Sequence, residues 1–239
     1  MKKLISAATV LALMMMGQAI GQAAEISCSA KDLACKEFAK LTGAGQFEKL
    51  IARVDARQNY SSDAKRLIGE AYLLLAGKEG NTPEQEEKLC RKALEYGATS
   101  AYMGLYYLYS KKDTEAALGF LKQYIATSPN DAAPYILLGE AEMGKKNYPA
   151  ANTYFHEAKK AARATSKDLE WVLFQTSYLI GDYYTACSLL NSAFALGKTV
   201  GDLKALVLDP RFSDMGSRLE FKKFFPVING TTAARMYAQ

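Results

Sequence analysis

The feature that most constrains the fold of this 239-residue chain is an internal repeat of apolar positions. Ala117, Ala151 and Ala186 lie 34 and 35 residues apart, and a large apolar side chain follows each alanine four residues later. A period of this length is typical of stacked helical units. Small residues let two helices approach closely, and a large residue one turn away fills the space beside them. The repeat therefore predicts a series of helix-turn-helix pairs.

Each unit of the repeat reads as a first amphipathic helix, a tight turn and a second helix. First helices are expected at residues 102–109, 135–143 and 171–178. Asp113, Asn147 and Asp182 stand where a side-chain oxygen can cap the second helix. Thr82 and Gln85, with a proline between them in the first helical turn, form the pattern of a capping box. These signals indicate where the second helices begin.

The repeated residues resemble the tetratricopeptide repeat (TPR), whose pattern pairs Leu-Gly and Tyr in the first helix with Ala and a large apolar residue in the second. Leu138-Gly139 with Ala151, Phe155 and Ala158 is the best match. The resemblance implies an all-α fold, a right-handed superhelical solenoid of about five helix-turn-helix repeats. The alternative that the residues leave open is a non-repeating helical bundle with alanine-rich contacts.

Two details of the chain depart from a plain tetratricopeptide pattern. The segment 94–98 ahead of Gly104 is similar to a Sel1-type repeat, which is a related family. Asp209-Pro210-Arg211-Phe212 is similar to the ending that often closes tetratricopeptide groups, and we expect capping helices at 202–208 and 217–225 around it. The predicted divisions are a signal peptide at 1–24, TPR-like repeats at 25–197, capping helices at 198–226 and a loosely held tail at 227–239.

The N-terminal segment has the pattern of a cleavable secretory signal. Two lysines after Met1 form a basic start, residues 4–16 are an uncharged apolar run, and small residues follow. Thirteen residues are too few for a membrane-spanning helix, which needs about 20. We expect cleavage after Ala23 or Ala24 and a mature protein that is periplasmic or secreted, with no transmembrane segment.

The side chains that could carry out chemistry are few and scattered. The single histidine, His156, has no visible catalytic or metal-binding partners, and no phosphate-binding loop, covalent haem motif or serine elbow occurs. The net charge of +5 falls to +3 once the two leader lysines are removed, which is weak for a nucleic-acid binder. We therefore predict no catalytic residues, no cofactor, no metal, no nucleic acid and no enzymatic activity.

The four cysteines divide into two kinds. Cys28 and Cys35 would meet an oxidising compartment, where a local disulfide is one outcome. Within one continuous helix their Cα atoms would be about 10.5 Å apart, beyond the roughly 7 Å limit for a disulfide. The bond therefore requires Cys28 to precede the helix, with Ser29 as a candidate cap. Cys90 and Cys187 fall in second helices, where small buried hydrophobic side chains are expected.

A solenoid of helix pairs presents a concave surface built from its first helices, and such surfaces bind peptides or protein segments. We therefore predict an exported protein–protein interaction scaffold; the alternatives are a structural subunit of a cell-envelope assembly, or an enzyme that uses the solenoid as a substrate platform. Inward-facing positions follow from the spacing around Gly69, Gly104, Gly139 and Phe174. The predicted partner-binding residues are Arg66, Glu70, Leu73, Leu105, Leu108, Ile136, Glu140, Met143, Trp171, Gln175 and Tyr178. Trp171 is either an anchor for the partner or buried between helices.

Overall fold

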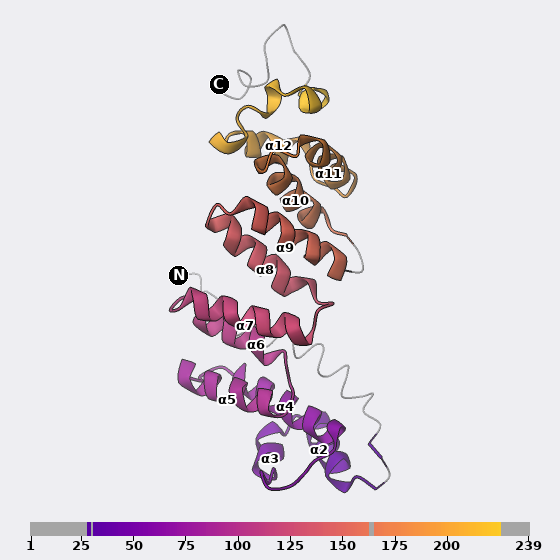
Figure 1. The fold of residues 1–239 in the computed structure, drawn as a ribbon. Helices are drawn as coiled ribbons and strands as arrows, with labels where there is room; N and C mark the ends of the chain where they lie inside the picture. The colour runs from indigo at the N-terminus through magenta and orange to yellow at the C-terminus, as the bar shows by residue number, and fades with distance from the viewer. Residues whose placement is uncertain (1–27, 30, 163–164, 226–239) are drawn as a thin grey trace. The chain divides into compact units, whose positions relative to one another are not determined.

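The computed structural model describes residues 28–29, 31–162 and 165–225, and every regular element in those ranges is a helix (Figure 1). The predicted signal peptide at 1–24 and the predicted tail at 227–239 lie outside these residues. Within them, no helix combines the length and apolar character needed to cross a membrane. The all-α class predicted from the repeat is confirmed.

The first compact unit, unit 1, extends to Ser128 and contains three helix pairs. The pairs are α2 (Leu33–Gly43) with α3 (Phe47–Ala52), α4 (Ser62–Ala76) with α5 (Pro83–Glu95), and α6 (Ala101–Tyr109) with α7 (Thr114–Thr127). α4 packs on both helices of the preceding pair, and α6 packs on α5. Each new pair therefore extends the core of its predecessor, as a stack of repeats requires.

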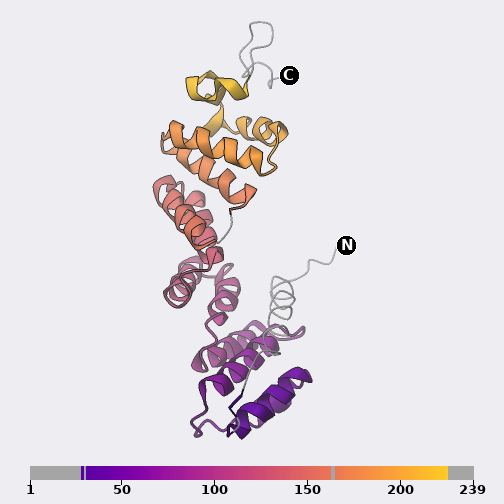
Figure 2. The same cartoon turned by 90° about the vertical axis from the view of Figure 1, so that its right-hand side faces the viewer.

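The second compact unit, unit 2, begins at Pro129 and contains two helix pairs and a C-terminal group of short helices. The pairs are α8 (Ala132–Gly144) with α9 (Tyr148–Ala161) and α10 (Lys167–Leu179) with α11 (Tyr183–Ala195). The C-terminal group consists of α12 (Val200–Val207) and the 3₁₀ helices η1 (Pro210–Phe212), η2 (Met215–Ser217) and η3 (Leu219–Phe224), the last three drawn in yellow (Figure 2). The described residues thus hold the five predicted pairs.

Side-chain caps set the beginnings of most second helices, as the sequence predicts. Asp113 and Asp182 accept hydrogen bonds from backbone N–H groups of α7 and α11, and Thr82 forms the predicted capping box at α5. Asn147 was expected to cap α9 in the same way, and this is wrong. Its Nδ2 donates instead to Glu142 Oε2 at 2.7 Å. The Asn147 side chain is therefore hydrogen-bonded to a carboxylate of the preceding helix and does not cap the backbone of α9.

Glycines in the first helices allow close helix contacts, but each has a different neighbour. A Cβ atom on Gly139 would lie 2.6 Å from Cε1 of Phe155 in the second helix of the same pair. A Cβ on Gly104 would lie 2.9 Å from Sγ of Cys90 in the preceding pair, and one on Gly69 would lie 2.8 Å from Cβ of Ala98. All three separations are shorter than real Cβ contacts, so a side chain at any of these glycines would force its neighbour to move.

The N-terminal end of unit 1 is held by a disulfide between Cys28 and Cys35. The two Cα atoms are 5.7 Å apart, because Cys28 precedes α2 as the spacing argument demands. The expected cap Ser29 is wrong: Asp32 caps α2 and accepts a hydrogen bond from the Cys35 N–H at 2.9 Å. Cys35 is buried with Phe38 in the hydrophobic cluster that α2, α3 and α4 share.

The C-terminal end of unit 2 is covered by aromatic and apolar side chains of the 3₁₀ helices. Phe212, Met215, Phe221 and Phe225 are all buried in the cluster that includes Phe174 of α10. The predicted helix at 217–225 is a 3₁₀ helix, not an α-helix. Phe221 and Phe225 are both anchored in that cluster, and this anchoring decides the backbone geometry.

Candidate partner-binding surface

The eleven residues predicted to bind a partner all lie on first helices, five in unit 1 and six in unit 2. α4 carries Arg66, Glu70 and Leu73; α6 carries Leu105 and Leu108; α8 carries Ile136, Glu140 and Met143; α10 carries Trp171, Gln175 and Tyr178. Within each helix they share one stripe, since they are spaced by three or four residues. The surface is described separately for each unit.

Three of these eleven residues belong to the core. Leu105 has no exposed surface, Tyr178 is 4% exposed and Leu73 is 9% exposed. Leu73 and Leu105 share a hydrophobic cluster with Cys90 of α5. Helical spacing predicts a stripe, but it does not distinguish the part of the stripe that a neighbouring helix covers. These three side chains support the surface from beneath, and a partner would meet the other eight.

On the unit 1 surface, Glu70 has an unusual environment. Its Oε2 atom is buried and has no hydrogen-bond partner. Burial raises the pKa of the Glu70 carboxyl group, and the positive charge of Arg66 one turn earlier only partly opposes this rise. Arg66 itself is exposed, and Leu108 is half-buried against the cluster beneath. This surface therefore combines apolar area with one desolvated carboxyl group.

On the unit 2 surface, Ile136 and Met143 are half-buried and flank the exposed Glu140 on α8. Trp171 on α10 is also half-buried, with its ring centroid 5.2 Å from that of Phe174. The Nζ of Lys198 lies 5.3 Å from the Trp171 ring centroid, which is the distance range of a cation–π contact. Part of the Trp171 ring thus packs against other side chains of the protein, and part remains accessible to solvent.

Tyr178 of α10 is hydrogen-bonded to residues of the C-terminal group of short helices. Its hydroxyl group donates a short hydrogen bond to Asp214 and accepts one from Arg218 Nε at 3.1 Å. The Arg218 guanidinium also binds Asp214 Oδ2 at 2.5 Å and lies 3.9 Å from the Tyr183 ring centroid. We call Tyr178, Asp214 and Arg218 the polar latch. Sequence analysis missed it because its members are up to 40 residues apart and no local pattern links them.

A buried ion pair in unit 2 was also missed. Glu170 is 1% exposed, and its Oε1 lies 2.6 Å from Lys159 Nζ and accepts a 2.6 Å hydrogen bond from the Thr165 hydroxyl. The structure uses Lys159 to neutralise a buried carboxylate of the next helix.

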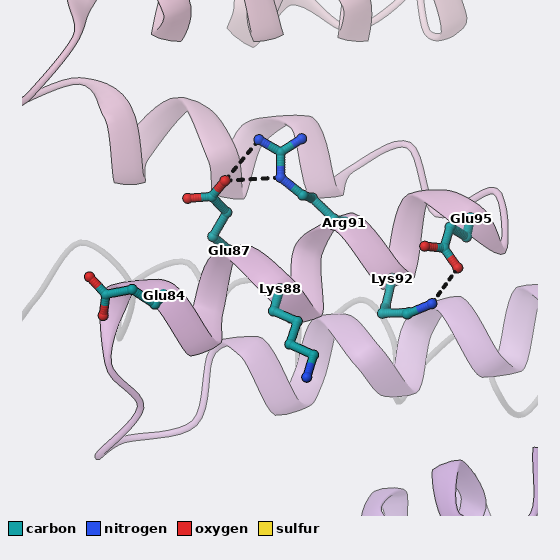
Figure 3. A pocket seen from close by; sticks show the side chains of 6 residues that line it. All are labelled: Glu84, Glu87, Lys88, Arg91, Lys92 and Glu95. Carbon is teal, nitrogen blue, oxygen red and sulfur yellow. Dashed lines mark hydrogen bonds and ion pairs between the residues drawn. The ribbon is translucent and has the colours of Figure 1, made fainter.

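A shallow hollow of unit 1 lies on α5, a second helix, and not on the predicted binding stripe (Figure 3). Its lining residues are Glu84, Glu87, Lys88, Arg91, Lys92 and Glu95. Arg91 pairs with Glu87 at 2.8 Å, and Lys92 pairs with Glu95 at 2.7 Å (Figure 3). Hydrogen bonds from Arg91 and from the Tyr109 hydroxyl lower the pKa of Glu87. Mutually paired charges of this kind are typical of an exposed helix surface.

The remaining reactive side chains of the described residues include His156 and the thiol of Cys90. No cluster of three or more His, Cys, Asp or Glu residues within those ranges has the geometry to hold a metal ion. His156 is half-buried; burial first, then the charges of Lys159 and Lys160, lower its pKa. Burial raises the pKa of the Cys90 thiol to about 12, so this cysteine stays protonated at neutral pH.

No protein-family model matches the chain, and no curated protein matches its sequence. Among solved structures, the chain is similar to a structure described as MamA RS-1 ArsTM double mutant, with 19% identity and a TM-score of 0.45; the match covers 70% of this chain and 96% of the other. It is also similar to MamA 41-end from Desulfovibrio magneticus RS-1, with 18% identity, a TM-score of 0.44 and coverage of 71% and 97%.

Proposed function

We propose that this protein is an exported, TPR-type scaffold that binds a peptide or protein segment on the stripes formed by its first helices. The observation that carries this proposal is the composition of those stripes. Unit 1 presents the half-buried Leu108 beside Glu70, and unit 2 presents three half-buried apolar side chains beside Glu140, namely Ile136, Met143 and Trp171. Such a surface suits a segment with apolar anchors, whereas a carboxylate-binding clamp would need several basic residues.

The disulfide between Cys28 and Cys35 supports the exported location. Disulfides persist in the periplasm and outside the cell but are rare in a reducing cytosol. The division into a signal peptide at 1–24, repeats at 25–197, capping helices at 198–226 and a tail at 227–239 belongs to the same proposal, as do the Sel1-like and end-of-group resemblances. Mass spectrometry of the purified native protein should find an N-terminus at Ala24 or Glu25; an intact Met1 would contradict export by this signal.

The binding proposal is tested by crosslinking and affinity capture from a native periplasmic extract. The test variant combines Ile136→Ser with Met143→Ser, which removes two half-buried apolar side chains from the α8 stripe. A captured protein should be retained by the wild type and lost with this variant, while circular dichroism shows unchanged helicity. Equal capture by wild type and variant would contradict binding of the partner on the α8 stripe.

A structural subunit of an envelope assembly is the second candidate, because residues 180–219 carry several exposed apolar side chains. Tyr184 is 86% exposed, Leu219 is 77% exposed and Leu208 is 65% exposed. Apolar surface outside the predicted stripes favours an assembly interface. The matched variant Tyr184→Ser with Leu219→Ser distinguishes the two candidates: loss of capture with this variant alone would favour the assembly subunit, and retention would favour the scaffold.

A further inference from the structure

Glu70 of α4 has a buried carboxyl oxygen without a hydrogen-bond partner among the described residues. Glu170 also has one buried oxygen without such a partner, but its other oxygen pairs with Lys159, whereas Glu70 forms no ion pair with a described residue. The Oε2 atom of Glu70 is shielded from solvent and accepts no hydrogen bond. A buried, unpartnered polar atom lowers stability, and the loss is greater for a charged group.

Buried apolar residues share the stripe with Glu70. Leu73 lies one turn further along α4 and belongs to the cluster that also contains Leu105 and Leu108 of α6. Burial is the largest cause of the raised pKa of Glu70.

Arg66 does not neutralise Glu70 directly. It lies four residues earlier on α4, is exposed, and makes no ion pair with Glu70 within 4.0 Å in the structure. Its charge acts on Glu70 only as a longer-range electrostatic effect, smaller than the effect of burial. The Oε2 atom of Glu70 therefore has no partner among the described side chains.

A raised carboxyl pKa in the folded state also has a consequence for stability. The folded protein holds the proton more tightly than the unfolded chain, so the stability that this group contributes is lost as pH rises through its folded-state pKa. Stability alone would favour a neutral residue at this position. A side chain that weakens the fold while lying on the predicted binding stripe is typical of a binding site.

We propose that the α4 stripe of unit 1 binds a protein segment carrying one lysine or arginine next to apolar residues, with Glu70 accepting a hydrogen bond from that basic side chain. The inference rests on the proposed function and names the chemistry of its partner. The apolar residues of the segment would cover Leu108, and the cation would pair with the half-buried Glu70 carboxyl group. An acidic segment would add like charge, and a purely apolar one would bury the carboxylate further without a partner.

The equivalent residue of unit 2 provides an internal contrast. Glu140 follows Gly139 as Glu70 follows Gly69, but Glu140 is exposed to solvent. A solvated carboxylate gains little from an ion pair, because water already stabilises it. The preference for a basic segment is therefore assigned to Glu70 and not to every carboxyl group at this position of the repeat.

The test is selection of a displayed library of random 12-residue peptides on the chain without residues 1–24. Three proteins are compared: wild type, Glu70→Gln and Arg66→Gln. Wild type should enrich peptides with one basic residue flanked by apolar ones. Glu70→Gln, which preserves the size of the side chain, should lose the basic preference while keeping the apolar one. Arg66→Gln should keep or strengthen the basic preference, because it removes a like charge near the incoming cation.

The most enriched peptide is then synthesised with its basic residue either retained or replaced by glutamine, and its affinity is measured by fluorescence anisotropy. The replacement should weaken binding to wild type by about tenfold and to Glu70→Gln by less than about threefold, as expected when a charged hydrogen bond is removed from only one of the two. Thermal unfolding should show that Glu70→Gln is at least as stable as wild type at pH 7, which excludes misfolding as the cause.

Each outcome has a defined meaning. Enriched peptides without a basic residue would overturn the inference about Glu70 and leave the scaffold proposal standing. An undiminished basic preference with Glu70→Gln would also overturn it, since the cation would then bind elsewhere. Failure of wild type to enrich any peptide would contradict peptide binding and the inference together.

Discussion

The first and last helix pairs of the protein cover their ends in different ways. At the N-terminal end of unit 1, a covalent bond ties Cys28 to buried Cys35, and the second helix, α3, has only six residues. At the C-terminal end of unit 2, no disulfide is found in the described residues, and four buried apolar side chains with the polar latch close the core instead. The N-terminal end thus adds a covalent crosslink to its hydrophobic cluster, whereas the C-terminal end is closed by aromatic packing and the polar latch.

This difference predicts that the two ends respond to different perturbations. The N-terminal end should depend on the redox state of the compartment, because reduction removes its crosslink. The C-terminal end should depend on side-chain volume and on pH, because its core is apolar and its latch includes a carboxylate. The following predictions test this contrast in order of expected effect.

The largest effect is expected for Phe221→Ala. Phe221 is fully buried and its ring centroid lies 5.5 Å from that of Tyr178 and 6.3 Å from that of Phe174. Truncation of a buried phenylalanine costs about 3–5 kcal/mol in the free energy of unfolding. Hydrogen exchange should show lost protection in α10, α11 and the 3₁₀ helices. The control Leu219→Ala removes a side chain that is 77% exposed and should change stability by less than about 0.5 kcal/mol.

Reduction of the disulfide between Cys28 and Cys35 should have an intermediate effect. A loop closed by a separation of seven residues contributes about 2–3 kcal/mol in the chain-entropy model. Hydrogen exchange with and without reductant should show lost protection in α2 and α3, with unit 2 unchanged. Alkylation without reductant should modify only Cys90 and Cys187 in the unfolded protein. Four modified cysteines, or lost protection in unit 2, would contradict this account of the N-terminal end.

The smallest effect is expected for Tyr178→Phe, which removes one hydroxyl group from the polar latch. The loss of its hydrogen bonds to Asp214 and Arg218 should cost about 1 kcal/mol at pH 7. The Tyr178 hydroxyl is the largest cause of the lowered pKa of Asp214. A lowered carboxyl pKa stabilises the folded state above the unfolded-state pKa, and this stabilisation is lost as pH falls through the folded-state value.

The stability difference between wild type and Tyr178→Phe should therefore shrink as pH falls from about 4, the unfolded-state pKa of an aspartate, through the lower folded-state pKa of Asp214. Chemical unfolding at pH 7 and at pH 3 measures this change. A difference that stays constant over that range would show that the hydroxyl acts independently of the Asp214 charge. A loss comparable to that of Phe221→Ala would show that the latch contributes as much as the packing of the aromatic rings.

The sequence was sufficient to predict the parts of the fold that depend on local spacing. The 34- and 35-residue offsets located the helix pairs, and Asp113, Asp182 and Thr82 marked where second helices begin. Each of these signals acts within one or two helical turns. Asn147 shows where such local signals fail: its side chain donates a hydrogen bond to Glu142 and does not cap the helix.

The candidate site was harder to predict because burial depends on neighbours that are distant in sequence. Leu105 and Leu108 are both apolar residues of one stripe on α6, yet Leu105 is fully buried and Leu108 is not. The desolvation of Glu70 likewise depends on tertiary packing that the local sequence does not reveal. The stripes themselves are still a prediction for partner binding, which the experiments above address.

The glycines of the first helices bear on whether the helix pairs could be exchanged as modules. Gly139 makes room for a phenyl ring of its own pair, whereas Gly104 makes room for a thiol of the preceding pair. A hybrid chain that moved α8 and α9 into the place of α6 and α7 would keep the Gly139–Phe155 match but would set a new helix against Cys90. Similar spacing in the sequence therefore does not make the pairs interchangeable, and a recombined array would have to transfer each glycine together with the side chain it accommodates.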